Sequence, residues 1–94
     1  MFPTELHFYV DPETGLPHIY NHNVTEDEVA DVLEEPHEDR RGRDGSRRAI
    51  GQTAAGRYLM VIYPLDLGRR SAFVITAYEL SGKGFAAYRR RRRR

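Results

Sequence analysis

The sequence predicts one α+β domain, in which a small antiparallel sheet is packed by two helices. Two observations predict this class. Helix signals lie between residues 17 and 36, and three β-prone runs follow between residues 47 and 80. Helical segments followed by consecutive strands are typical of α+β folds. Ninety-four residues suffice for one small core, so we expect residues 1–88 to form a single domain with three or four strands in a meander.

The N-terminal segment predicts an edge strand and a turn. Residues 6–10 (LHFYV) are aromatic and β-prone, and the turn-forming DPETG follows at 11–15. Residues 16–22 (LPHIYNH) fit two alternatives, the return strand of a hairpin or one to two helical turns. Pro17 favours the helical alternative slightly, because proline suits the first position of a helix.

The clearest element is an acidic helix that begins after Thr25. Thr25 and Glu28 have the spacing of a capping box, and three carboxylates in the first turn complement the helix dipole. Val29, Val32 and Leu33 form one narrow apolar face, and Pro36 ends the helix. About ten residues are marginal as an isolated helix, so we expect this one to pack on the sheet.

The second half predicts a loop, three strands and a short helix. Residues 36–47 hold almost nothing that could be buried, which predicts a mobile charged loop. Strands are expected at 47–53, at 57–63 and at 71–80, with a loop at 64–70. The second strand is nearly continuously apolar, which is typical of a central strand covered on both faces. A short helix is expected at 83–89, with Phe85 and Tyr88 facing inward.

Charge is distributed very unevenly along the chain. Residues 1–39 contain no Lys or Arg and carry a formal charge of −11, whereas residues 40–94 carry +12. The last six residues, 89–94, are all Arg, and their mutual repulsion predicts a disordered tail. Such asymmetry favours contact with nucleic acid or with an acidic partner. The tail itself has two interpretations: non-specific attachment to RNA, ribosome or DNA, or a clamp onto the carboxylates of the acidic helix.

Composition excludes several classes of function. The chain has no Cys, which excludes disulfides, thiolate zinc sites, iron–sulfur clusters and cysteine nucleophiles. No apolar run approaches the roughly 20 residues that span a bilayer, and the N-terminus lacks the pattern of a signal peptide. We therefore expect a cytoplasmic protein without membrane contact.

Three segments, in this order and spacing, resemble the BrnT-like toxins of bacterial type II toxin–antitoxin pairs, within the RelE/ParE-like group. The first is HIYNHNVT at 18–25, followed by the acidic helix. The second is RAIG at 48–51, running through Gly56 and Arg57 into 59–62. The third is ITAY at 75–78 with Tyr88. The chain departs from the family at Asn23, at Tyr78, where many members have Arg, and at 84–85.

The resemblance implies a RelE-like fold and a basic surface that engages RNA or the ribosome. It also implies a cognate antitoxin, usually a small DNA-binding protein of the ribbon-helix-helix type that blocks the toxin. Toxins of this group typically act as ribonucleases and halt translation.

The residues themselves supply candidates for metal-free RNA cleavage, which needs a base, an acid and cations around the phosphate. His18 and His22 fit the first two roles, because histidine is the side chain that commonly exchanges protons near neutral pH. We name His22, His18, Arg57 and Tyr78 as candidate catalytic residues. Candidate RNA-binding residues are basic or aromatic side chains near strand ends and in the C-terminal segment: Arg47, Arg48, Lys83, Tyr88, Arg89 and Arg90.

Other interpretations of these residues stay open. The histidines could be capping or packing residues, and the arginines could be solvated residues at strand ends. If helical, His18 and His22 would also suit zinc, but no third ligand stands at a recognisable spacing, so we predict neither a metal nor a cofactor. The main alternative function is a non-catalytic module that binds RNA or protein. A homodimer that pairs the acidic half of one copy with the basic half of another ranks last, because exposed ion pairs contribute little affinity.

Overall fold

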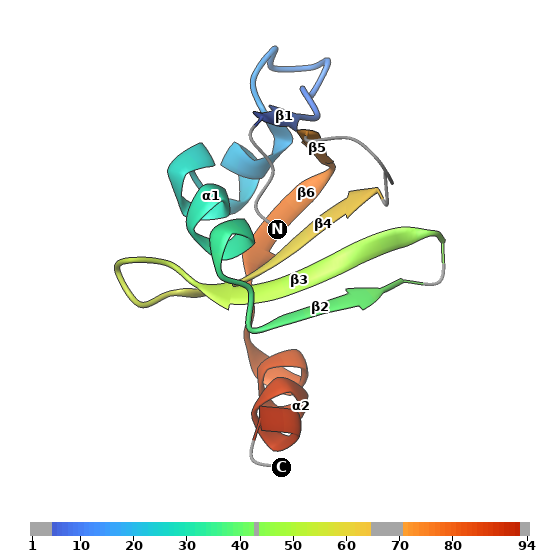
Figure 1. Ribbon diagram of the computed structural model, residues 1–94. Coiled ribbons are helices and arrows are strands. Elements are labelled where there is room, and N and C mark those ends of the chain that lie inside the picture. The colour runs from blue at the N-terminus through green and yellow to red at the C-terminus, as the bar shows by residue number, and fades with distance from the viewer. Residues whose placement is uncertain (1–4, 43, 65–70, 93–94) are drawn as a thin grey trace.

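The structure is a computed structural model, and it describes residues 5–42, 44–64 and 71–92. Its main layer is a four-stranded antiparallel sheet in the order β2-β3-β4-β6 (Figure 1). The bounds of its strands are β2 Glu38–Arg41, β3 Ser46–Gln52, β4 Tyr58–Pro64 and β6 Thr76–Glu79. With two helices against this sheet, the predicted α+β class is confirmed.

A second, smaller sheet lies at one end of the molecule. Strands β1 (Glu5–Phe8) and β5 (Ser71–Val74) pair in parallel, with His7 opposite Phe73. The prediction of one continuous strand at 71–80 is therefore wrong. The chain divides at Ile75, whose backbone N–H donates to the carbonyl of Ile62 at 2.9 Å, and β6 then joins the main sheet. Because β5 turns aside to pair with β1, one apolar run serves two sheets.

The helical alternative for residues 16–22 is correct. They contain a short 3₁₀ helix, η1 (His18–His22), which ends at Asn23 with a left-handed φ of 59°. Helix α1 (Glu26–Glu34) follows, and its capping box is formed as predicted. Glu28 N–H donates to Thr25 Oγ1 at 3.2 Å, and the Thr25 N–H donates to Glu28 Oε1 at 3.0 Å. Two short helices are thus joined through a tight left-handed turn.

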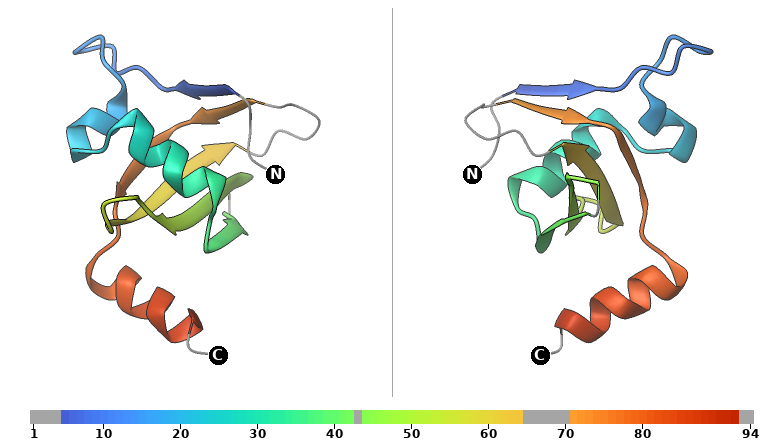
Figure 2. Two further views of the ribbon diagram at one scale, coloured as in Figure 1. Left: turned by 60° about the vertical axis from the view of Figure 1, so that its left-hand side comes forward. Right: turned by 90° about the vertical axis from the view of Figure 1, so that its right-hand side faces the viewer.

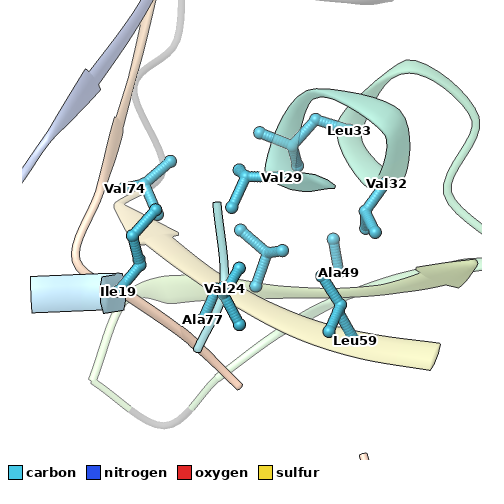
Figure 3. Packing of buried hydrophobic residues seen from close by; sticks show 10 residues of the cluster. Ile19, Val24, Val29, Val32, Leu33, Ala49, Leu59, Val74 and Ala77 are labelled. Atoms are coloured by element: carbon cyan, nitrogen blue, oxygen red, sulfur yellow. The ribbon is translucent and has the colours of Figure 1, made fainter. Parts of the chain in front are cut away.

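Helix α1 covers one face of the main sheet and forms the core with it. Its residues Val29 and Val32 are fully buried against Ala49 of β3 and Leu59 of β4 (Figure 3). Gly51 allows this close packing, because a Cβ there would lie 3.1 Å from Val32 Cγ1. The core also contains Leu33 of α1 and residues of η1, of the turn before α1 and of β4, β5 and β6: Ile19, Val24, Val61, Val74 and Ala77.

Helix α2 (Gly82–Arg92) packs on the opposite face, far from β1 and β5 (Figure 2). Its inward residues, Phe85 and Tyr88, contact Ile50, Tyr58 and Leu80, as their i, i+3 spacing predicted. The helix is longer than expected, and the prediction that the arginine tail is disordered fails for residues 89–92. Arg91 is held by an ion pair with Glu38 at 2.7 Å, and Arg89 lies over the ring of Phe85.

The predicted mobile loop at 36–47 is also wrong, since it contains β2 and the start of β3. Cross-strand pairing places Arg40 opposite Arg48 and Asp39 opposite Ala49. Charged side chains can occupy an edge strand when opposite charges on neighbouring elements compensate them. Here Asp39 binds Arg47 at 2.8 Å, and Glu38 binds Arg91. Most of the loop expected at 64–70 lies outside the described residues. None of the described helices has the length and apolar character to cross a membrane.

Candidate functional site

Three of the four predicted catalytic residues come together at the edge of the main sheet. The rings of His18 and His22, both on η1, have their centroids 5.3 Å apart. Tyr78 of β6 approaches His22 edge-on, at 6.2 Å between centroids. Tyr9 lies on the other side, 6.2 Å from His18. The result is a row of four rings, Tyr9, His18, His22 and Tyr78, in which His22 is exposed and His18 and Tyr78 are half-exposed.

Asp11 lies beside the first histidine and was not singled out from the sequence. Its Oδ2 is 3.7 Å from His18 Nδ1 and accepts a hydrogen bond from Asn21 Nδ2 at 3.1 Å. The backbone N–H of Glu13 and the amide of Asn21, donating to this carboxylate, lower the pKa of Asp11. Asp11 therefore stays charged and can pair with protonated His18. In the sequence, Asp11 is the first residue of the DPETG turn, and this position indicates a turn former rather than a partner for histidine.

Arg57, the fourth predicted catalytic residue, is committed to other contacts. Its Nη1 donates to both oxygens of Glu28, at 3.0 and 2.9 Å, and to the carbonyl of Asn23 at 2.9 Å. Its Nη2 lies 3.5 Å from Glu79. Burial alone would raise the pKa of Glu28, but hydrogen bonds from Thr25 and Arg57 outweigh it and lower that pKa. The geometry assigns Arg57 to fixing the η1–α1 junction beside His22 rather than to contacting phosphate.

Arg47 and Arg48 point to opposite faces of the sheet, because side chains alternate along a strand. Arg47 donates to Asp39 through Nε at 2.8 Å, and Asp39 also accepts from the Tyr63 hydroxyl at 2.6 Å. Burial and this carboxylate raise the pKa of Tyr63 to about 12. Arg47 is therefore neutralised within the fold. Arg48, on the face that α2 partly covers, forms no ion pair with any described residue.

The face carrying Arg48 contains a basic groove of about 620 Å³ between β2, β3 and α2. Arg40, Arg41 and Arg48 line it, and neither Arg40 nor Arg41 has an ion-pair partner within the described ranges. Asp44 is its one lining carboxylate in the described chain, held by Ser46 Oγ at 2.6 Å. The remaining lining residues are apolar or small, together with the paired Arg91: Gly42, Ile50, Met60, Leu80, Gly84, Ala87 and Arg91.

Arg40 and Arg41 are not among the RNA-binding candidates predicted from the sequence, because they lie in the segment predicted to be a mobile loop. The available signal was the two-residue spacing of Glu38 from Arg40 and of Arg48 from Ile50, which places each pair on one face if the segment is a strand. Strand pairing then brings Arg40 and Arg48 into one surface, because Arg40 is opposite Arg48, Arg48 is opposite Ile62, and Ile62 is opposite Thr76. Arg41 is opposite Arg47 and lines the groove from the end of its strand. Tyr78, two residues on, has the same facing as Thr76. Neighbouring strands lie about 4.8 Å apart, so roughly 10 Å separates the strand of Tyr78 from that of Arg48.

The prediction that Tyr88 binds RNA is contradicted by the structure. Its side chain is buried, with 3% exposure, and its hydroxyl lies 2.6 Å from His37 Nδ1. Burial raises the pKa of Tyr88. A base cannot stack on this ring, because Tyr58, Phe85 and His37 already surround it. Lys83, Arg89 and Arg90 lie on exposed positions of α2, away from the four-ring row.

No group of three or more metal-ligating side chains is present in the described part of the chain. Comparisons with known proteins found no matching family model, no matching curated protein and no matching solved structure. Functional inference therefore depends on the residues and geometry described above.

Proposed function

We propose that this chain is a toxin-like protein of a type II toxin–antitoxin pair that binds RNA in the basic groove. The observation that supports this proposal most strongly is the convergence of Arg40, Arg41 and Arg48 on one groove without ion-pair partners among the described residues. Three other cations, Arg47, Arg57 and Arg91, are paired with carboxylates of the fold. Some arginines thus form ion pairs within the fold, whereas the three groove arginines are available to bind an external anion.

The groove has the chemistry of a nucleic-acid site. Guanidinium groups bind phosphate bidentately, and apolar side chains such as Met60 and Leu80 offer a floor for base or sugar. Electrostatic binding of this kind releases counterions, so affinity falls steeply as salt rises. The exposed arginines of α2 extend the positive surface beyond the groove. RNA or the ribosome is the expected partner, in the cytoplasm, and an antitoxin of the ribbon-helix-helix type is the expected inhibitor by resemblance.

The four-ring row favours a second candidate function, metal-independent RNA cleavage. His22 would remove the proton of a 2′-hydroxyl, and the 2′-oxygen would attack the neighbouring phosphorus. His18, protonated beside Asp11, would give its proton to the departing 5′-oxygen, leaving a 2′,3′-cyclic phosphate. The two imidazole rings are in edge-to-face contact, with centroids 5.3 Å apart, so a phosphate would lie across the exposed edges of the pair, within reach of both base and acid. Asp11 adjoins this row at His18, and the row's histidines lie in the acidic half of the chain, so RNA binding in the groove remains the main proposal.

The binding proposal is tested with a fluorescent 12-nucleotide single-stranded RNA, titrated at several salt concentrations. Arg40→Gln with Arg48→Gln should weaken binding at least tenfold and reduce the salt slope by about 1.4, since each lost phosphate contact removes about 0.7 from the slope. Arg47→Gln is the matched control for Arg48→Gln alone, which should reduce the slope by about 0.7. It also removes one charge, one residue from Arg48 but on the opposite face, and should leave the slope nearly unchanged. Equal effects of the two changes would contradict the proposal.

The toxin role and the cleavage role are tested together in bacteria. Expression should arrest growth, and co-expression of the adjacent open reading frame should restore it if that frame encodes the antitoxin. His22→Gln separates the two candidates. Growth arrest with intact RNA in this variant indicates inhibition by binding, whereas loss of both arrest and cleavage indicates catalysis. Normal growth with the unaltered chain, shown to be folded and expressed, would contradict the toxin role.

A further inference from the structure

The large hydrophobic side chains that the described structure exposes gather at the end of the molecule opposite α2. They lie in residues 9–20 and 73–75, with exposures between 38% and 53%: Tyr9, Val10, Leu16, Tyr20, Phe73 and Ile75. Figures 1 and 2 place β1 and β5 at this end and α2 at the other. Five of the six, all except Tyr20, are called the apolar end below. Soluble monomers rarely expose such a group of side chains unless it contacts a partner.

Strand pairing brings the side chains of the apolar end next to one another, so that they form one continuous surface. Tyr9 N–H donates to the carbonyl of Val74 at 2.9 Å, which brings Tyr9 beside Ile75. His7 is opposite Phe73, and alternation along the two strands gives Tyr9 and Phe73 the same outward facing. Val10 forms a β-bridge with Pro17, which brings Leu16 to the same region. The inward residues of these strands, such as Phe8 and Val74, pack on the core instead.

The charges around the apolar end identify the chemistry of the partner. The exposed Glu5 and Glu13 flank it, and residues 1–39 contain no Lys or Arg. A symmetric contact with a second copy would bring these carboxylates against one another, which disfavours a homodimer through this surface. Within the described chain, β1 pairs on one side only, with β5. An extended segment could therefore add along β1 and place alternate side chains on the apolar end.

We propose that the apolar end docks a segment of a partner protein in which apolar and basic residues alternate. The apolar side chains of the segment cover Phe73 and Tyr9, and its basic side chains face the flanking carboxylates. This surface is separate from the basic groove, which lies beside α2 at the other end of the molecule. The partner and RNA in the groove therefore bind at the same time. Because Tyr9 also belongs to the four-ring row, the bound partner lies beside that row.

The experiment uses two synthetic peptides, one of alternating Arg and Val and one of alternating Glu and Val, with the complete ¹⁵N-labelled chain. The Arg–Val peptide should shift the amide resonances of residues 5–11 and 71–75 in a saturable way, and the Glu–Val peptide should not. Phe73→Ser should weaken binding about tenfold, the effect of losing roughly half the burial of a Phe side chain. Val10→Thr, at a second exposed position, should weaken it by a smaller factor, and Lys83→Gln, on α2, should have no effect.

Three results would overturn the proposal. The first is equal binding of both peptides, or shifts confined to the acidic surface of α1. The second is a dimer in light scattering that Phe73→Ser dissociates, because the occupant would then be a second copy. The third is displacement of the bound peptide by the 12-nucleotide RNA, because the two sites would then overlap. Failure of RNA binding alone leaves this inference standing, since the peptide titration contains no RNA.

Discussion

Two histidine–tyrosine pairs of the described chain, His37–Tyr88 and His22–Tyr78, differ in their surroundings. His37 and Tyr88 are joined by a 2.6 Å contact between Nδ1 and the hydroxyl, with the rings nearly parallel at 17°. Tyr88 is buried there, where α2 packs on β3 and β4. His22 and Tyr78 meet edge-on at 65°, and His22 is exposed. One pair is closed by packing, whereas the other keeps ring nitrogens and a hydroxyl accessible to a ligand.

The comparison shows that packing, not residue type, decides which histidine and tyrosine can act on a ligand. Around the closed pair, Tyr58 packs against both Phe85 and Tyr88, and Glu38 binds Arg91 on the next turn of α2. These contacts hold α2 against the sheet and so form one wall of the basic groove. Around the open pair, Arg57 holds the backbone at Asn23, next to His22, and the His22 side chain stays exposed. The closed pair helps to form the groove, and the open pair supplies an exposed imidazole that could act on bound RNA.

The largest expected difference between the pairs is the effect of deleting the ring. Tyr88→Ala should lower the free energy of unfolding by about 3 kcal/mol, because it opens a cavity among Tyr58, Phe85 and Ile50. Tyr78→Ala should cost about 1 kcal/mol, because its ring is half-exposed. Urea denaturation followed by circular dichroism measures both values. Equal costs would remove the distinction between a closed and an open pair.

A smaller effect is expected from the ion pair that supports the closed site. The hydrogen bond from Arg91 lowers the pKa of Glu38 below its ordinary value of 4.5. Glu38 therefore stabilises the fold above pH 4.5, and this contribution is lost as the pH falls below that value and through the folded-state pKa. Glu38→Gln should cost about 1 kcal/mol at pH 7, a value reduced for solvent screening because Arg91 is 35% exposed.

The cost of Glu38→Gln should shrink when the same urea titrations are repeated at pH 3, where the carboxylate of the unaltered chain is increasingly protonated. The exposed Glu35 provides the control, and Glu35→Gln should change stability little at either pH. A cost that stays constant between pH 7 and pH 3 would show that the ion pair does not hold α2.

Removing only the hydroxyl separates the hydrogen bond from the packing of the ring. Tyr88→Phe should cost about 1 kcal/mol, because His37 loses its partner in a partly buried position. Tyr78→Phe keeps the edge-on contact with His22 and should change the free energy of unfolding by less than about 0.5 kcal/mol. Thermal unfolding of the two variants under identical conditions measures this contrast, and a larger loss for Tyr78→Phe would reverse it.

The sequence predicted the parts of the fold that depend on local signals. The capping box at Thr25 and Glu28, the apolar face of α1 and the inward spacing of Phe85 and Tyr88 all have short-range signatures, and all are confirmed. The predictions from the sequence were wrong where contacts between residues far apart in the chain determine the secondary structure. β2 exists because Glu38 and Asp39 find arginines on α2 and β3, and the division at Ile75 depends on pairing of β5 with a strand more than sixty residues earlier.

The candidate site divides in the same way. His18 and His22 could be placed together because they lie four residues apart, and the adjacency of Tyr78 followed only from the fold. Arg57 and Arg47 were expected to meet phosphate, yet each has a carboxylate partner that periodicity does not reveal. Arg40 was overlooked because its strand has no apolar residue. Charge alone therefore identified the basic half of the chain but not which of its cations remain available.

The smallest expected effect on stability is also the sharpest test of the open pair. His22→Gln should change the free energy of unfolding by less than about 0.5 kcal/mol, since its side chain is exposed and forms no hydrogen bond within the described chain. His37→Gln, the matched change at the closed pair, should cost more than 1 kcal/mol, because the stack on Tyr88 and the 2.6 Å contact are both lost. The same two variants, assayed for cleavage of the 12-nucleotide RNA, should show the reverse order. If the cleavage candidate is correct, His22→Gln abolishes the reaction and His37→Gln retains it, so that stability and activity depend on different histidines.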